Sequence, residues 1–203
     1  MGYLLAVIGG YLIGCSSMAL YLSKLRHVDV RRNGSGNLGA SNATILLGWK
    51  AGLLVALHDI LKAVAAVLLA RLLFPELTHV GAAAGAACVL GHIFPFYLRF
   101  QGGKGFASFF GVALALDWKF ALILAVILIL ITLITDYIVF STVTAAVSIP
   151  VFLSAAAGSL VLLAILMIPA AVILCRHREN YTRIRNGTEI GLRSTNRGDH
   201  RIP

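Results

Sequence analysis

Charged residues are scarce in this sequence, and acidic residues are the scarcest. Only 12% of the 203 residues are charged and eight are Asp or Glu, whereas 59% are hydrophobic. Since an average soluble protein carries about 25% charged residues, the composition excludes an ordinary water-soluble domain. So few carboxylates also argue against a metal cage, and we expect no metal ion and no cofactor. We interpret the net charge of +9 as a membrane-topology signal and not as a sign of nucleic-acid binding.

Motifs for covalent catalysis are also missing. The chain has no G-x-S-x-G elbow, no H-E-x-x-H motif and no H-x-x-x-x-D motif of the soluble acyl-CoA transferases. Cys15, Cys88 and Cys175 lie far apart in apolar stretches, so we expect them to be small core residues and not disulfides or zinc ligands. An enzyme built on this chain would therefore work by positioning its substrates, without a covalent intermediate.

Apolar runs of membrane-spanning length fill most of the chain. About 20 apolar residues cross a bilayer as a helix. The expected spans are about 3–22, 51–73, 79–98, 105–116, 120–135, 137–157 and 159–175. The fourth and fifth are short, so two short helices and a partly re-entrant pair both stay open. We predict an all-α integral membrane protein with about seven transmembrane helices, in one domain (1–203) with a flexible cytoplasmic tail from residue 190.

Basic residues predict the orientation of these spans. Of the 17 Lys and Arg residues, only Arg71 and Lys119 fall on one side of the expected membrane, and Lys62 lies within a span. The remainder lie in connections and the tail on the other side, which the positive-inside rule assigns to the cytoplasm. The N-terminus is then outside and the C-terminus cytoplasmic.

A polar loop at residues 33–42 interrupts the apolar sequence. It holds three glycines, three asparagines and two serines, with no carboxylate. Glycine lets backbone N–H groups converge on a ligand, and Ser and Asn add side-chain donors. The loop suits an anion such as a phosphate, although a flexible connector is an open alternative. The candidate binding residues here are Gly34, Ser35, Gly36, Asn37 and Asn42.

A second polar element, Gly102-Gly103-Lys104-Gly105, directly precedes an apolar segment. Glycines before a helix start can present free N–H groups, and the helix dipole favours a negative charge there. Lys104 adds a mobile positive charge. The spacing is not that of a Walker A motif, and a simple turn between helices would look similar.

A third element follows the last apolar run, where Arg176, His177, Asn180 and Arg183 could share one helix face. The other arginines of the tail are interpreted as topological anchors. Within the spans, Asp59 and Lys62 could form an intramembrane ion pair of functional or structural importance. His92, near the end of a span, is open to a core or a site role.

Together these three elements resemble the motifs of the acyl-phosphate–glycerol-3-phosphate acyltransferases, small bacterial inner-membrane enzymes. The family pattern GSGNxGATN is similar to residues 34–42, GGKGxAT to 102–108, and RHxxNIxRLxxGxE to 176–189. Ser41 and Ser108 replace threonines of the pattern and keep a hydroxyl. Ile45 stands where the family usually has an arginine, which removes an expected positive charge.

The resemblance implies transfer of a fatty acyl group from acyl phosphate to the 1-hydroxyl of glycerol 3-phosphate, giving lysophosphatidic acid and phosphate at the cytoplasmic face. It implies catalytic roles for Ser35, Lys104 and His177. Acyl phosphate is expected near Ser35, Asn37, Gly102, Gly103 and Lys104, and glycerol 3-phosphate near Arg176, His177 and Asn180, with Glu189 as a further binding residue. A substrate phosphate is the expected proton acceptor, and His177 orients it. The partners are the two substrates and membrane lipid, with a soluble acyl-phosphate-producing enzyme as a further candidate.

A transporter or channel for an organic phosphate is the alternative. It would require polar groups that continue through the spans and basic residues on both faces. The nearly uncharged external side and the single deep pair of Asp59 and Lys62 do not favour it.

Overall fold

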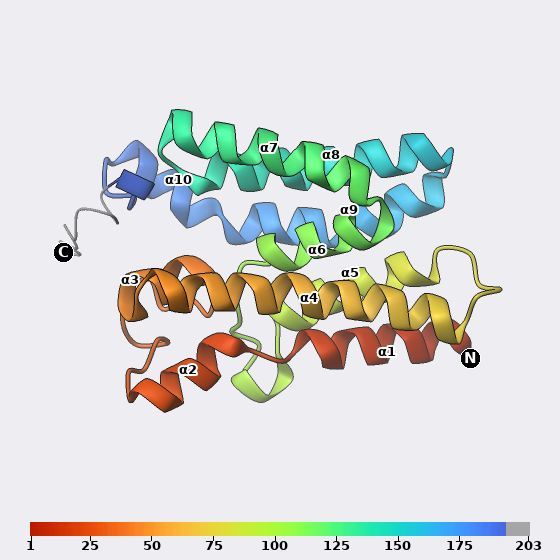
Figure 1. The fold of residues 1–203 in the computed structure, drawn as a ribbon, viewed down its shortest axis with the longest axis horizontal. Coiled ribbons are helices and arrows are strands. Elements are labelled where there is room, and N and C mark those ends of the chain that lie inside the picture. Colours follow the sequence, from red (N-terminus) through yellow and green to blue (C-terminus); the bar gives the residue numbers. More distant parts are fainter. Residues whose placement is uncertain (194–203) are drawn as a thin grey trace.

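The computed structural model describes residues 1–193, and this part of the chain is built from helices and loops without a strand (Figure 1). The helices are α1 (Gly2–Gly14), α2 (Met18–Arg26), α3 (Ala40–Leu47), α4 (Trp49–Leu73), α5 (Val80–Ile93), the short η1 (Phe96–Leu98), α6 (Phe106–Leu116), α7 (Trp118–Thr135), α8 (Ile138–Ala157), α9 (Leu160–Arg176) and α10 (Arg178–Arg185).

Among residues 1–193, six helical stretches are long and apolar enough to cross a membrane. They are 2–26, 49–73, 80–98, 118–135, 138–157 and 160–185. The all-α integral membrane architecture expected from the sequence is thus confirmed. The expected span that is not among these six is the fourth, residues 105–116, which forms α6. Its 11 residues extend about 16 Å at 1.5 Å per residue, roughly half of a 30 Å hydrocarbon core.

Helix α6 lies at the centre of the molecule, between α4 on one side and α8 and α9 on the other (Figure 1). It turns into α7 at Asp117, whose side chain caps α7 by accepting the N–H of Phe120 at 3.0 Å. Phe109, Val112 and Ala113 of α6 are fully buried in the main core cluster, whereas α7 presents many exposed apolar side chains. The two segments are therefore two separate helices, one central and one peripheral.

The first expected span, about 3–22, is present as the stretch 2–26, but it is built from two helices with a break that the sequence did not predict. Helix α1 ends at Gly14, and Ser17 caps α2 by accepting the N–H of Leu20. The carbonyl groups freed at the break are bound elsewhere: that of Cys15 by the hydroxyl of Tyr97 at 2.6 Å, and that of Ser16 by Lys62 at 2.8 Å. Distant polar side chains thus satisfy the interrupted backbone, as a membrane interior requires.

Small residues allow the helices of this half to approach closely. A side chain added at Gly10 or Gly14 of α1 would collide with the backbone of Ala84 or Cys88 of α5. Gly85 of α5 packs in the same way against Val67 and Val112. The small-residue packing predicted for residues 81–87 is confirmed.

One smaller expectation, that all three cysteines are core residues, needs correction. Cys15 and Cys88 are buried as expected, but Cys175 is exposed on α9. Residues 192 and 193 are tied to the α7–α8 turn, because the N–H of Leu192 donates to the carbonyl of Asp136 and that of Arg193 to its carboxylate, both at 2.9 Å. The tail expected from residue 190 stays a prediction, since its residues 194–203 lie outside the described part.

Candidate active site

The first polar loop connects α2 to α3 and owes its shape to Asn42. This side chain is only 1% exposed. Its oxygen accepts the N–H of Ser35 at 2.9 Å, and its amino group donates to the carbonyls of Val30 and Asn37 at 2.9 Å and of Asn33 at 3.3 Å. Asn42 thus reaches across the loop and binds its backbone in four places. Its hydrogen bonds are all used by the protein itself, so its role here is to hold the loop.

Glycine is required at two turns of this loop. Gly34 and Gly36 have φ of 60° and 65°, the left-handed region that other residues adopt at a cost. A side chain on Gly34 would also collide with the oxygen of Asn42. The resulting loop leaves Ser35 exposed and leaves the side-chain oxygen of Asn37 buried without a hydrogen-bond partner in the described structure. An oxygen in that position suits a hydroxyl donor.

Helix α3 follows directly and offers free N–H groups. The first backbone bond into the helix runs from the N–H of Ala43 to the carbonyl of Gly39 at 3.1 Å. The N–H groups of residues 40–42 therefore have no partner within the helix, and with the helix dipole they favour an anion.

Asp29 belongs to the same loop and was missed by the sequence analysis. Its carboxylate accepts two hydrogen bonds at 3.0 Å from the guanidinium of Arg31, which holds the pKa of Asp29 below its usual range. Its carbonyl accepts the side chain of Asn33 at 2.8 Å. The D-x-R spacing was the signal available in the sequence. Arg31 is thereby occupied, so this arginine braces the loop.

The second polar element folds back onto the end of α5. The N–H of Gly102 donates to the carbonyl of Ile93 at 2.9 Å, and that of Gly103 to the carbonyl of His92 at 3.0 Å. These two N–H groups were expected to be free for an anion, and that expectation is wrong. They satisfy the last carbonyls of α5, which have no partner within their own helix. The free N–H groups instead belong to the first turn of α6, where the first backbone bond is from Phe109 to Gly105.

The third element joins the second through a network of side chains. Lys104 Nζ donates to Asn180 Oδ1, and Asn180 Nδ2 donates to Glu189 Oε1, both at 2.5 Å. The other oxygen of Glu189 accepts Arg183 Nε at 2.6 Å. Gly187, with φ of 68°, forms the turn that brings Glu189 back to α10. Residues 104, 180, 183 and 189 are thus one connected polar cluster, which joins the second motif to the third.

The environment of Lys104 lowers the pKa of its ammonium group. Partial burial lowers the pKa of its ammonium group from the usual 10.5 to about 8, and the nearby positive charges of Arg183 and Arg176 act in the same direction. Glu189 and Glu179 oppose this effect. A positive charge held in a partly dry site interacts more strongly with a bound anion than one in bulk water.

His177 lies at the junction of α9 and α10 and is 5% exposed. Its Nδ1 lies 2.8 Å from the carbonyl of Ile173. A carbonyl can only accept, so Nδ1 carries a proton and, in the neutral ring, Nε2 has the free lone pair. Arg176, the predicted binding residue beside His177, is exposed. Ile45, which stands where the family usually has an arginine, is half-buried on α3.

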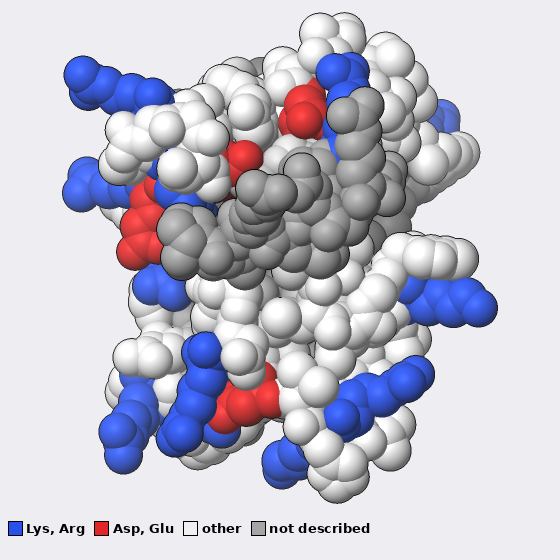
Figure 2. Space-filling model, turned by 90° about the vertical axis from the view of Figure 1, so that its left-hand side faces the viewer, with Lys and Arg blue, Asp and Glu red and all other residues white. Residues whose placement is uncertain are grey.

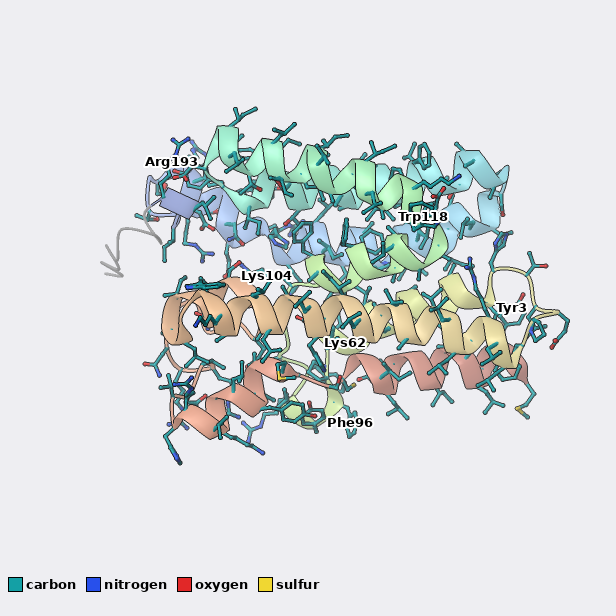
Figure 3. The ribbon with its side chains drawn as sticks, viewed as in Figure 1. Tyr3, Lys62, Phe96, Lys104, Trp118 and Arg193 are labelled. Atoms are coloured by element: carbon teal, nitrogen blue, oxygen red, sulfur yellow. The ribbon has the colours of Figure 1, made fainter. Side chains whose placement is uncertain are left out.

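All three elements lie at the same end of the molecule, the end where α3 and α10 are drawn (Figure 1). Lys104 lies between the layer that contains α4 and the layer that contains α9 (Figure 3). Figure 2 looks at this end and shows Lys and Arg side chains around its rim. Within residues 1–193, no group of three or more His, Cys, Asp or Glu residues could hold a metal ion. The arrangement can bind phosphate groups and position them.

The chain is similar to known proteins along almost its whole length. Residues 4–187 match the family model "Glycerol-3-phosphate acyltransferase". Curated proteins of that name from Geotalea daltonii and Mesorhizobium japonicum are 38% and 41% identical to the chain. The matches cover 90% and 93% of this chain, and 94% and 95% of the two relatives.

Two solved structures have the same fold. Both are crystal structures of PlsY (YgiH), an integral membrane glycerol 3-phosphate acyltransferase, one in its glycerol 3-phosphate form and one in its lysophosphatidic acid form. They are 36% identical to this chain, with TM-scores of 0.88 and 0.84. The first covers 97% of this chain and 98% of its own, and the second 94% and 95%. From its sequence, its fold and the three polar elements gathered at one end, this chain belongs to the glycerol-3-phosphate acyltransferase family.

Proposed function

We propose that this protein transfers a fatty acyl group from acyl phosphate to the 1-hydroxyl of glycerol 3-phosphate, giving lysophosphatidic acid and phosphate. The observation that carries the proposal is the cluster of Lys104, Asn180, Arg183 and Glu189. It joins two motif segments that are more than 70 residues apart in the chain and sets a cation beside the free N–H groups of α6. Both substrates carry a phosphate that such a site would hold.

We assign the binding of acyl phosphate, the acyl donor, to Ser35, Asn37, Lys104 and the first turns of α3 and α6. Gly102 and Gly103 contribute by shape, since neither position has room for a side chain. Glycerol 3-phosphate is assigned to Arg176, His177 and Asn180, with Glu189 holding Asn180 in place. Gly34, Gly36 and Asn42 act through the shape of the first loop.

The chemistry needs no acyl-enzyme. The 1-hydroxyl oxygen attacks the acyl carbonyl carbon, the bond from that carbon to the phosphate oxygen breaks, and phosphate leaves with both bonding electrons. The hydroxyl proton passes to a substrate phosphate, and His177 helps to orient glycerol 3-phosphate. Lys104 and the N–H groups stabilise the negative charge that develops on the oxygens.

We infer that α6 is a short fourth crossing, which makes seven, with the N-terminus outside and the site on the cytoplasmic face of a bacterial inner membrane. The described N-terminus and α10 lie at opposite ends of the molecule (Figure 1), and most basic residues gather at the end of the site. A soluble enzyme that makes acyl phosphate could then deliver it to this face.

Cysteine labelling tests the orientation. In a variant without Cys15, Cys88 and Cys175, a Glu76→Cys substitution should react with an impermeant maleimide in intact cells. An Arg31→Cys substitution in the same background should react only after the cells are opened. The reverse pattern would contradict the orientation.

The function is tested with purified protein in detergent, acyl phosphate and glycerol 3-phosphate. Release of phosphate together with lysophosphatidic acid, detected by mass spectrometry, is the expected result. Phosphate release without the lipid product would indicate a hydrolase, and no release with any acyl chain would refute the proposal. The transport alternative lacks support, because the deep ionisable groups bind one another in a closed cluster.

A further inference from the structure

Three ionisable residues are buried together in the middle of the helical bundle. Asp59 and Lys62 lie on α4 and His92 lies on α5, with exposures of 2%, 6% and 7%. None of them belongs to the three motif segments. Removing charges from water costs several kcal/mol per ion unless they are paired and hydrogen-bonded, and ionisable groups in a membrane interior are usually functional.

Lys62 uses all three of its donors. Its Nζ lies 2.8 Å from Asp59 Oδ1, 2.8 Å from the carbonyl of Ser16 and 2.9 Å from His92 Nδ1. Asp59 Oδ1 also lies 3.3 Å from Nδ1 of His92, but the ammonium group is closer and has no acceptor, so Nδ1 accepts from Lys62 and the ring carries its proton on Nε2. Lys62 thereby fixes both the tautomer and the orientation of His92.

His92 in turn supports the loop that carries Lys104. Its carbonyl accepts the N–H of Gly103 at 3.0 Å. The Nε2 edge of its ring packs against the α-carbon of Gly103, where an added side chain would collide with it. Gly102 is held in the same way by the adjacent carbonyl of Ile93. Figure 3 places Lys62 near the middle of the molecule and Lys104 closer to the end with the site.

We propose that Lys62, with Asp59 and His92, is a buried support that positions the Gly102–Lys104 loop for acyl transfer. The ammonium group of Lys62 joins α4 to the break between α1 and α2 and to α5. His92 on α5 contacts Gly103, so its position determines the position of the residue before Lys104. Asp59 neutralises the buried ammonium group. Lys62 and His92 are thus positioning residues that touch neither substrate. The inference rests on the proposed function.

The test separates charge compensation from positioning. Lys62→Met alone leaves the buried Asp59 carboxylate without its lysine, with only the imidazoles of His92 and His58 at 3.3 Å and 3.6 Å, so the melting temperature should fall. The double variant Asp59→Asn with Lys62→Met removes both charges, and its melting temperature should return close to that of the parent. Its kcat should stay about 100-fold lower, because displacing a reacting group by about 1 Å can cost that much. Lys119→Met, at an exposed lysine, is the control for the same substitution elsewhere and should leave both quantities unchanged.

A pair of substitutions at His92 gives a second, independent readout. Asn places an acceptor where Nδ1 stands, whereas Leu offers Lys62 none. His92→Asn should therefore keep at least 10-fold more kcat than His92→Leu. Recovery of full kcat in the double variant, or equal kcat for the two His92 variants, would overturn the proposal. Activity of the parent protein, measured alongside, tests the proposed function separately.

Discussion

Lys104 gives the sharpest prediction, because its charge is expected to disappear within an accessible pH range. We expect kcat/KM for acyl transfer to fall as the pH rises through about 8. The lowered pKa of the Lys104 ammonium group means that the free enzyme loses this charge well before an ordinary lysine would. The site proposed to bind the two substrate phosphates then loses the charged hydrogen-bond donor that Asn180 holds in place.

The size of the effect follows from the position of that pKa. With a pKa of about 8, roughly a tenth of the molecules carry the charge at pH 9, whereas an unperturbed lysine would be more than nine-tenths charged. Above pH 8, kcat/KM should therefore fall about tenfold for each pH unit. Lys104→Met, which lacks the charge at every pH, should lose about 100- to 1000-fold, as expected when a group that stabilises developing charge is removed.

The assay is the initial rate of lysophosphatidic acid formation from pH 6 to about 10, corrected for spontaneous hydrolysis of the donor. Lys104→Arg is the matched control, since a guanidinium stays protonated throughout this range. This variant should lose activity because of its different shape, but its profile should lack the fall near pH 8. A parent profile that stays flat up to about pH 9.5, or a Lys104→Arg profile with the same fall, would refute the reasoning.

Further predictions concern the loops and the missing arginine. Asn42→Ala removes four hydrogen bonds inside the first loop and should lower the free energy of unfolding by about 2–3 kcal/mol. The melting temperature should fall accordingly. An unchanged melting temperature would show that the loop holds its shape without Asn42. Gly103→Ala should lower kcat about 100-fold, since the added methyl group would displace the ring of His92. Gly9→Ala should leave kcat unchanged, because no other atom lies near the position of its added methyl group. Ile45→Arg should lower KM for glycerol 3-phosphate about tenfold, worth one charged hydrogen bond, and Ile45→Leu should not; no change with arginine would mean that another cation already fills that role. If His177→Gln abolishes activity while KM for glycerol 3-phosphate is unchanged, His177 is the general base and the assignment of the proton to a substrate phosphate is wrong.

The sequence predicted the membrane class and the packing of small residues, because each depends on a local pattern. It placed Asn180, Arg183 and Glu189 in one motif, but the contact of Asn180 with Lys104, 76 residues away, is a tertiary one that no local pattern contains. Runs of apolar residues need no tertiary information to be recognised, and the spacing of Asn180, Arg183 and Glu189 is short. The sequence did not predict the use of the N–H groups of Gly102 and Gly103, because these bind carbonyls at the end of α5, whose geometry depends on the turn at residues 94–101. Nor did it predict the break after Gly14, which no proline marks and which Lys62 and Tyr97 satisfy from more than 40 residues away.

Because α6 is short, the enzyme can bind its lipid substrate directly from the surrounding membrane. Helix α4 has 25 residues and α6 has 11, about 37 Å and 16 Å long. Lys104, which comes just before α6, lies inward from the end of the bundle (Figure 3). An anionic head bound there can leave its acyl chain within the hydrocarbon layer. The donor concentration that the enzyme experiences is then the mole fraction of acyl phosphate in the surrounding membrane or micelle. Diluting the donor with inert detergent at constant total volume should therefore lower the rate, even though its bulk concentration does not change.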